Sequence, residues 1–266
     1  MATTTAVTAV SEATAVILGA TGAVGTPLLG QLVSDSSPYT RVVSFARREH
    51  PAPPSSSKVK FEEVVVDFEK LFQKDASEQA KFAGVKADAV FITMGTTRAA
   101  AGSGAAFEKI DRGYVLAAAK ALHDPKHPAT MVYCSSGQAS SASRFPYLKS
   151  KGLTEEGLAS MYAKTIIMRP GFLQNAQRKE SRVFEKLSQP FFNLGAKISD
   201  SLQADVKDVA AAMIKAAQLG PEKLNDQVLA TPLPNNFRLE PEAAGHQIAI
   251  VLNNHILQLT RPAQSS

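Results

Sequence analysis

The sequence predicts an α/β protein with a doubly wound parallel sheet and a small C-terminal substrate or lid region. Between residues 14 and 171, short β-branched runs alternate with longer helical patterns, which is typical of parallel strands joined by helices. A glycine-rich segment directly follows the first of these runs. The chain has 266 residues, 44% of them hydrophobic, and is therefore long enough for one large domain with a substantial core.

Six short, apolar, β-branched runs are predicted to be the buried strands of that sheet. They span residues 14–19, 40–46, 61–67, 88–95, 129–136 and 164–171. Helices are predicted between them at about residues 23–34, 69–82, 104–121 and 146–162. The Pro- and Ser-rich segment 50–58 is predicted to be a plain loop in place of a crossover helix. A switch in strand order beside the first strand then opens a ligand crevice at the carboxyl ends of the strands.

The pattern loosens after residue 171. A lid-like stretch is expected there, followed by a helix at about 203–219, a short strand at 226–231 and a final helix at about 241–258. We therefore expect residues 14–266 to form a single domain whose lid-like part begins at about 172. Residues 1–13 are predicted to be a flexible tail, because this segment matches neither a secretory signal nor an Arg-rich transit peptide.

Composition argues against several classes of function. The one cysteine, Cys134, allows no intramolecular disulfide and indicates a reducing compartment. The net charge is +5, but the basic residues are scattered among acidic ones along the sequence. We therefore expect no nucleic-acid-binding surface. The apolar runs fall far short of the roughly 20 residues that a bilayer-spanning helix needs. His123 and His127 have no further ligand at metal-binding spacing, so we expect no metal site.

Three glycines mark the first functional motif. Gly19, Gly22 and Gly25 lie in GATGAVG, after the first predicted strand and at the start of the first predicted helix. This is the context that the dinucleotide-binding fingerprint of a Rossmann-type domain requires. Gly19 permits the tight turn, Gly22 lets backbone amides approach a pyrophosphate, and Gly25 lets the helix pack closely on the strand. The sequence therefore predicts a dinucleotide site at this loop.

The residues after the second predicted strand indicate which dinucleotide binds. In an NAD-selective domain this strand usually ends in a carboxylate that binds the ribose 2′-hydroxyl. Here Arg47 and Arg48 follow the strand, and guanidinium groups favour the 2′-phosphate of NADP. Asp67, after the third strand, either accepts a hydrogen bond from the adenine amino group or caps the next helix.

Tyr147 and Lys151 are the candidate catalytic pair. They lie four residues apart in SRFPYLKSKG, so a helix presents both on one face. The spacing alone also fits a solvated helix surface. In the catalytic interpretation the ammonium stabilises the phenolate, so that the phenol can exchange a proton near neutral pH. Lys149 is taken as surface charge.

Several motifs together resemble the atypical short-chain dehydrogenase/reductases. The segments are GATGAVG, VVDFEKL, MGTTRAAAG, KIDRGYVL, CSSG, SRFPYLKSKG and MRPGFL. They are most similar to the group that contains the metazoan Tat-interacting oxidoreductase and its fungal relatives on the mitochondrial outer membrane. The resemblance covers about residues 14–182, and GTTRAAAG and SRFPYLKSKG favour the fungal branch.

The resemblance also implies roles for individual residues. The catalytic group would be Tyr147 and Lys151 with Ser136, Ser135 being the alternative serine. The implied cofactor contacts are Thr21, Gly22, Ala23, Val24, Arg47, Arg48, Met94, Gly95, Lys151, Leu173 and Arg182.

The resulting expectation is an NADP-dependent oxidoreductase that transfers hydride between the nicotinamide and a small carbonyl or alcohol. Tyr147 would donate the proton, Ser136 would hydrogen-bond the carbonyl oxygen, and Lys151 would also bind the ribose. The alternative is an NADPH-binding redox sensor that acts through a protein partner without turnover. The resemblance places the protein peripherally on the cytosolic face of the mitochondrial outer membrane, with a cytoplasmic location as the alternative.

Overall fold

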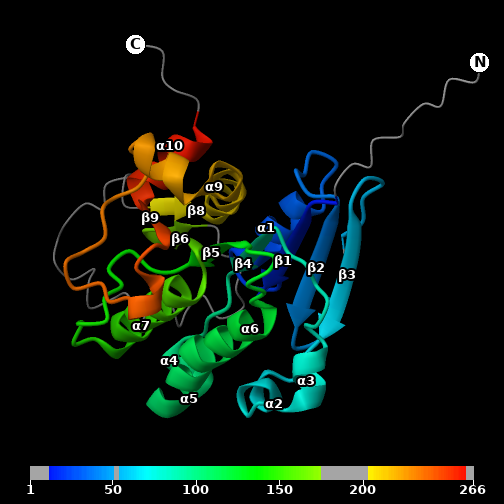
Figure 1. Ribbon diagram of the computed structural model, residues 1–266, viewed down its shortest axis with the longest axis horizontal. Helices are drawn as coiled ribbons and strands as arrows, with labels where there is room; N and C mark the ends of the chain where they lie inside the picture. The colour runs from blue at the N-terminus through cyan, green and yellow to red at the C-terminus, as the bar shows by residue number, and fades with distance from the viewer. Residues whose placement is uncertain (1–11, 51–53, 175–202, 262–266) are drawn as a thin grey trace, which may run out of the picture.

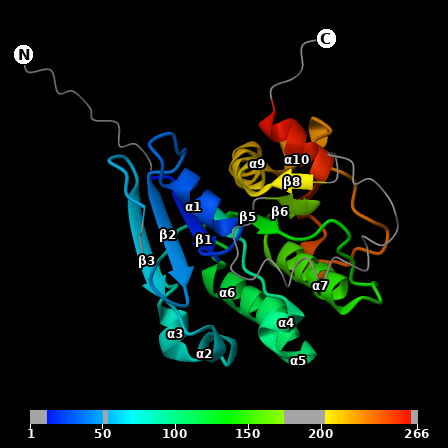
Figure 2. The ribbon, with the colours of Figure 1, turned by 180° about the vertical axis from the view of Figure 1, so that it is seen from behind.

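The centre of the protein is a parallel sheet of seven strands in the order β3-β2-β1-β4-β5-β6-β9. The computed structural model describes residues 12–50, 54–174 and 203–261, and Figures 1 and 2 show the sheet from opposite sides. Its strands are β1 (Thr14–Leu18), β2 (Arg41–Ala46), β3 (Lys60–Val65), β4 (Ala89–Ile92), β5 (Thr130–Cys134), β6 (Lys164–Arg169) and β9 (Gln247–Leu252). The predicted doubly wound sheet is confirmed.

Helices cover both faces of the sheet (Figure 1). One face carries α1 (Gly25–Leu32), α9 (Val206–Asp226) and α10 (Asn253–Thr260), and the other carries α2 (Phe68–Phe72), α6 (Tyr114–Leu122) and α7 (Pro146–Met161). Each face of the sheet has its own hydrophobic core: the first core lies under α1, α9 and α10, and the second lies under α2, α6 and α7. Ala15 and Ile17 of β1 belong to the first core, whereas Val16 and Leu18 belong to the second. The strand therefore serves two cores, because successive side chains point to opposite faces.

The remaining elements are short. They are α3 (Ala76–Ala80), α4 (Arg98–Ala101), α5 (Gly104–Glu108), a π-helical turn (Lys109–Gly113), a 3₁₀ turn (Pro241–Ala243) and a two-stranded sheet of β7 (Phe172–Gln174) and β8 (Gln203–Asp205). Within the described ranges, no helix has the length and apolarity that crossing a membrane requires.

Strand order reverses at β1. From β1 the chain goes first to β2 and β3 on one side and then to β4, β5 and β6 on the other. The connections after β1 and β4 therefore leave in opposite directions, which opens a crevice at the carboxyl ends of these two strands.

Two predicted helices are each interrupted. The segment 69–82 holds α2 and α3 as separate helices, because Asp75 caps α3 by accepting hydrogen bonds from the N–H groups of Ser77 and Glu78. The segment 104–121 runs through α5, the π-helical turn and α6. The capping aspartate is a start signal that periodicity alone overlooks.

The final helix predicted at 241–258 is wrong in its first half. Residues Gln247–Leu252 form β9, which pairs with β6 along its whole length. Its residues 248–251 are buried, and a short buried run cannot be told from a helix by periodicity alone. The strand predicted at 226–231 is also wrong: α9 extends to Asp226, and only an isolated bridge between Thr231 and Ile250 follows.

The region beyond residue 172 contributes to the core of the protein. Strand β9 completes the sheet, and α9 packs against α1 and α10 in the first core. Residues 1–11 and 175–202 lie outside the described residues, and they hold most of the expected tail and much of the expected lid. The single domain, the tail and the lid stay predictions.

Gly152 offers a test of the packing of α7. A Cβ at this position would collide with the backbone of Ser140 and Ser141, so we expect Gly152→Ala to lower the free energy of unfolding by about 1–3 kcal/mol. Gly30 is the matched control, because it lies in α1 and nothing is near an added Cβ. Gly30→Ala should raise that free energy by about 0.5–1 kcal/mol. Urea unfolding measures both, and equal effects would contradict the close contact.

Candidate functional site

The glycine loop packs directly against the carboxyl end of β4. Gly19 has a φ of 92°, in the left-handed region that favours glycine, and a Cβ there would lie 2.7 Å from the backbone nitrogen of Met94. A Cβ on Gly25 would collide with the carbonyl of Gly19. The hydroxyl of Thr93 donates a hydrogen bond to that carbonyl at 3.0 Å. The loop and the end of β4 therefore form one rigid edge of the crevice.

The helix that follows the loop begins in a way that suits an anion. Val24 is the N-cap residue of α1, no side chain caps the helix, and the first turn holds no acidic residue. Thr21 is exposed, while Gly22 and Ala23 are half-buried. The N–H groups of Ala23, Val24 and Gly25 make no hydrogen bond among the described residues. These groups and the positive end of the helix dipole can therefore bind a phosphate.

Arg47 and Arg48 directly follow β2, next to the glycine loop along the sheet edge. Both side chains are exposed, and neither guanidinium forms a hydrogen bond or an ion pair with another described residue. Two free guanidinium groups at this position suit a phosphate on the adenosine ribose.

Asp67 caps α2. Its Oδ1 accepts hydrogen bonds from the N–H groups of Glu69 at 3.0 Å and of Lys70 at 3.1 Å. Of the two alternatives, the structure shows the helix cap. The side chain is exposed and its Oδ2 has no hydrogen bond from the described residues, so a contact to adenine stays a prediction.

Lys151 is buried, although its sequence also fits a surface helix. The residue has an exposed fraction of 4%. Its Nζ lies 3.1 Å from Asp111 Oδ1 and donates a hydrogen bond to the hydroxyl of Tyr133 at 3.1 Å. Tyr147, one turn earlier on α7, is half-buried, and Lys149 is exposed. The two candidates thus share the inner face of α7, and the solvated-surface interpretation does not fit Lys151.

The neighbours of Lys151 keep it charged. Burial by itself lowers the pKa of this ammonium, but Tyr133 and Asp111 hold its pKa well above the ordinary lysine value. Burial also raises the pKa of Tyr133, so this phenol is neutral near pH 7. The negative charge that balances Lys151 there is therefore the carboxylate of Asp111.

The two candidate serines have different surroundings. Ser135 is buried, and its hydroxyl donates a hydrogen bond to Glu155 Oε1 at 2.5 Å. Glu155 also accepts hydrogen bonds from Nε and Nη2 of Arg169, at 3.0 Å and 2.5 Å. Burial raises the pKa of Glu155 despite this ion pair. Ser136 is half-buried, and its hydroxyl makes no hydrogen bond among the described residues, so it remains the serine free to act.

The other predicted contacts lie in different places. Met94 and Gly95 lie two and three residues beyond the end of β4, where Met94 is half-buried and Gly95 is exposed. Leu173 lies in β7 and packs against the first core. Arg182 lies outside the described residues.

Sequence reasoning did not assign Asp111, Tyr133 or the pair of Glu155 and Arg169. A signal for Asp111 was present, because it lies four residues from Phe107 and from Val115, and all three are buried. An acidic residue in phase with apolar ones marks a buried charge that needs a partner. Tyr133 carried no such signal, since a tyrosine is ordinary in a strand.

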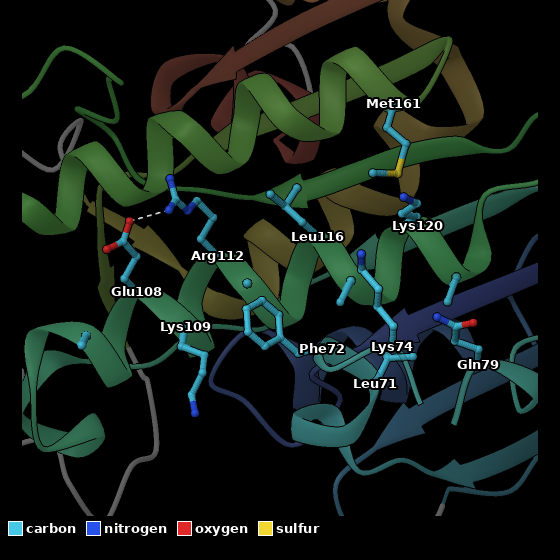
Figure 3. A pocket seen from close by; sticks show the side chains of 14 residues that line it. Leu71, Phe72, Lys74, Gln79, Glu108, Lys109, Arg112, Leu116, Lys120 and Met161 are labelled. Carbon is cyan, nitrogen blue, oxygen red and sulfur yellow. Dashed lines mark hydrogen bonds and ion pairs between the residues drawn. The ribbon is translucent and has the colours of Figure 1, made fainter. Parts of the chain in front are cut away.

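A cavity of about 840 Å³ lies among α2, α5, the π-helical turn and α6. Figure 3 shows Phe72, Leu116 and Met161 at this cavity, with Lys74 and Lys120 beside them. None of the predicted site residues lines it. The crevice is therefore identified by its topology and its charges, and not by cavity size.

Comparison with known proteins agrees with this geometry. Residues 19–218 match the family described as NAD(P)H-binding. "Protein fmp52, mitochondrial" of Emericella nidulans is 34% identical over 218 residues, which cover 80% of this chain and 90% of the relative. "Protein FMP52, mitochondrial" of Candida albicans is 32% identical over 219 residues, which cover 80% and 92%.

Solved structures share the fold at low identity. A nucleoside-diphosphate-sugar epimerase from Agrobacterium tumefaciens has a TM-score of 0.57 and 16% identity, with 94% of this chain and 84% of the epimerase covered. The Bordetella bronchiseptica enzyme WbmF in complex with NAD+ has a TM-score of 0.54 and 16% identity, with 94% and 91% covered. At this identity the likeness shows the fold alone.

The serines can be separated by stability. Ser135→Ala leaves buried Glu155 short of one donor, so the free energy of unfolding should fall by about 1–3 kcal/mol. Ser136→Ala should change it by less than about 0.5 kcal/mol. Urea unfolding of the two variants is the measurement. A larger loss for Ser136→Ala would show that the hydrogen-bond assignment is wrong.

Proposed function

The chain belongs to the NAD(P)H-binding family, and on this basis we propose that it is an NADP-dependent oxidoreductase of the short-chain dehydrogenase/reductase type. It transfers hydride between the nicotinamide and a small carbonyl or alcohol. The observation that carries the proposal is the buried, charge-paired Lys151 on the same face of α7 as Tyr147. A buried ammonium is costly unless it is paired, and a plain surface helix has no need of one.

The residues at the crevice fit the parts of the reaction. The bound nicotinamide supplies the hydride for the carbonyl carbon. Tyr147 donates a proton to the carbonyl oxygen, so one hydride and one proton convert the carbonyl to an alcohol. Ser136 donates a hydrogen bond to the same oxygen and polarises the carbonyl. Lys151 stabilises the resulting phenolate and binds the ribose hydroxyls.

The choice of NADP rests on Arg47 and Arg48. Both guanidinium groups are free of other partners among the described residues and lie where the adenosine ribose of a Rossmann-bound dinucleotide is placed. A 2′-phosphate would accept charge-assisted hydrogen bonds from them. Gly19, Gly22 and Gly25 with the first turn of α1 would hold the pyrophosphate.

The names of the relatives support a mitochondrial location, and the more specific position on the outer membrane rests on the motifs. The fungal relatives carry the word mitochondrial in their names, in line with the fungal branch expected from the motifs. We place the protein peripherally on the cytosolic face of the mitochondrial outer membrane. Protease treatment of intact mitochondria should digest it, and a protected matrix protein would contradict this location. Kinship with the Tat-interacting oxidoreductase rests on the motifs alone.

Removing both arginines tests the choice of cofactor. Arg47→Ala with Arg48→Ala should weaken NADPH binding by about 1.5–3 kcal/mol, because charge-assisted contacts to the phosphate are lost. NADH binding should change little. Arg261→Ala, with an exposed arginine at the end of α10, is the control and should leave both affinities unchanged. Calorimetric titration finding equal losses for NADPH and NADH would remove the claim of NADP preference.

Removing one oxygen tests the proton donor. Tyr147→Phe keeps the ring but not the hydroxyl, so turnover should fall by about 10²- to 10⁴-fold while NADPH affinity is kept. Lys151→Met should lower both turnover and NADPH affinity, whereas Lys149→Met, on the exposed side of the same helix, should lower neither. Carbonyl-dependent loss of NADPH absorbance measures the rates.

The outcome for the parent chain also decides between the enzyme and the redox sensor. Undiminished turnover in Tyr147→Phe would contradict the proton-donor role. A parent chain that binds NADPH and reduces no carbonyl across a broad panel would favour the sensor that acts through a protein partner.

A further inference from the structure

Lys151 lies between two residues to which the sequence motifs assigned no role. We propose that Asp111 and Tyr133 are positioning residues that hold the Lys151 ammonium at the carboxyl edge of the sheet, charged and aligned before a cofactor binds. This inference rests on the proposed function, because Lys151 is there a cofactor-binding and catalytic residue. Asp111 and Tyr133 act through Lys151.

The three side chains converge from three separate elements. Asp111 comes from the π-helical turn, Tyr133 from β5, and Lys151 from α7. The exposed fractions of Asp111 and Tyr133 are both 0%. The Nζ of Lys151 also lies 5.2 Å from the ring centroid of Tyr133. Because each element belongs to the packed core, the position of the ammonium is set by the fold and not by solvent.

Asp111 and Lys151 each need the charge of the other, because both are buried. Oδ1 of Asp111 makes no hydrogen bond within the described residues, so the ammonium 3.1 Å away is what balances it. Oδ2 accepts a hydrogen bond from Ser150 at 3.3 Å. Loss of either charge would leave the other buried and unpaired, which is far costlier than loss of a surface pair.

The pair also lies at the crevice. A Cβ on Gly95, three residues beyond the end of β4, would be 3.2 Å from Asp111 Oδ1 and 3.3 Å from Lys151 Nζ. Gly95 thus lets the backbone at the end of β4 pack tightly on the ion pair. The π-helical turn that carries Asp111 fits this view, since such turns occur frequently at functional sites.

Other titratable groups near Lys151 do not replace Asp111. Burial raises the pKa of the Cys134 thiol to about 11, so this group is neutral near pH 7. Glu155 is already engaged by Arg169 and Ser135. The groups that face the ammonium from its own helix and from its neighbours are Asp111, Tyr133, Cys134, Tyr147 and Glu155.

The test measures NADPH affinity as a function of pH by calorimetry. The parent should bind with nearly constant affinity between pH 7.5 and pH 9, because Lys151 stays charged and the 2′-phosphate, whose second pKa is about 6, is already ionised. In Asp111→Asn, burial acts on the lysine without an opposing charge, so affinity should fall about tenfold or more as pH rises over that range. Tyr133→Phe should weaken binding several-fold without new pH dependence. Asp124→Asn, in the turn after α6, is the acidic control and should match the parent.

Unfolding measured against pH gives a readout that needs no cofactor. In Asp111→Asn the folded lysine has a pKa below that of the unfolded chain, so its stability deficit relative to the parent should shrink as pH rises toward 10. If the stability deficit of Asp111→Asn were the same at every pH, the substitution would have disturbed only the packing around residue 111. That result, or Asp111→Asn binding NADPH like the parent at every pH, would overturn the inference. A parent that fails to bind NADPH would overturn the proposed function. The pH dependence of unfolding would still show whether Asp111 keeps the buried Lys151 charged.

Discussion

A positive charge is buried at the carboxyl edge of the sheet, and the elements around it supply an opposite charge and a hydrogen-bond acceptor. Lys151 projects inward from α7, Asp111 supplies the opposite charge, and Tyr133 accepts a hydrogen bond. Burial of an unpaired ammonium would destabilise the fold by several kcal/mol. The π-helical turn, the carboxyl end of β5 and the first half of α7 are thereby tied together at Lys151, four residues beyond the tyrosine that is the proposed proton donor.

A second constraint comes from the glycine loop. The backbone at Gly19 approaches the end of β4 so closely that no side chain fits there, and Gly25 lets α1 begin directly above that turn. The same end of β4 packs on the ion pair through Gly95. The switch in strand order therefore brings an anion-binding helix terminus and a buried cation to one crevice. A dinucleotide, whose pyrophosphate joins two ribose units, matches this arrangement with its pyrophosphate at the helix terminus and one ribose near the ammonium.

Much of the fold could be predicted because the signals were local. Five of the first six strands were short buried runs, and the glycine loop stood between a strand and a helix. The third, β3, is the edge strand of the sheet, and its residues are half-buried or exposed instead of buried as expected. The parts that could not be predicted depend on distant partners. Strand β9 exists because β6 offers an unpaired edge, and Asp111 is tolerated because Lys151 faces it across forty residues of sequence.

In the candidate site too, features set by local sequence could be predicted and features set by distant partners could not. The shared face of Tyr147 and Lys151 follows from helical spacing, and the position of Arg47 and Arg48 at the carboxyl end of β2 follows from the strand that precedes them. The different surroundings of the two serines could not be predicted from the sequence. Ser135 and Ser136 are adjacent and chemically identical, and only the position of Glu155 in space shows which hydroxyl is engaged.

The most direct test of the central claim is calorimetric titration of the full-length parent chain with NADPH and with NADH under the same conditions. The account predicts one binding site per chain and at least about tenfold tighter binding of NADPH, as expected when charge-assisted contacts to the 2′-phosphate are gained. Tighter binding of NADH, or no binding of either dinucleotide by folded protein, would contradict it.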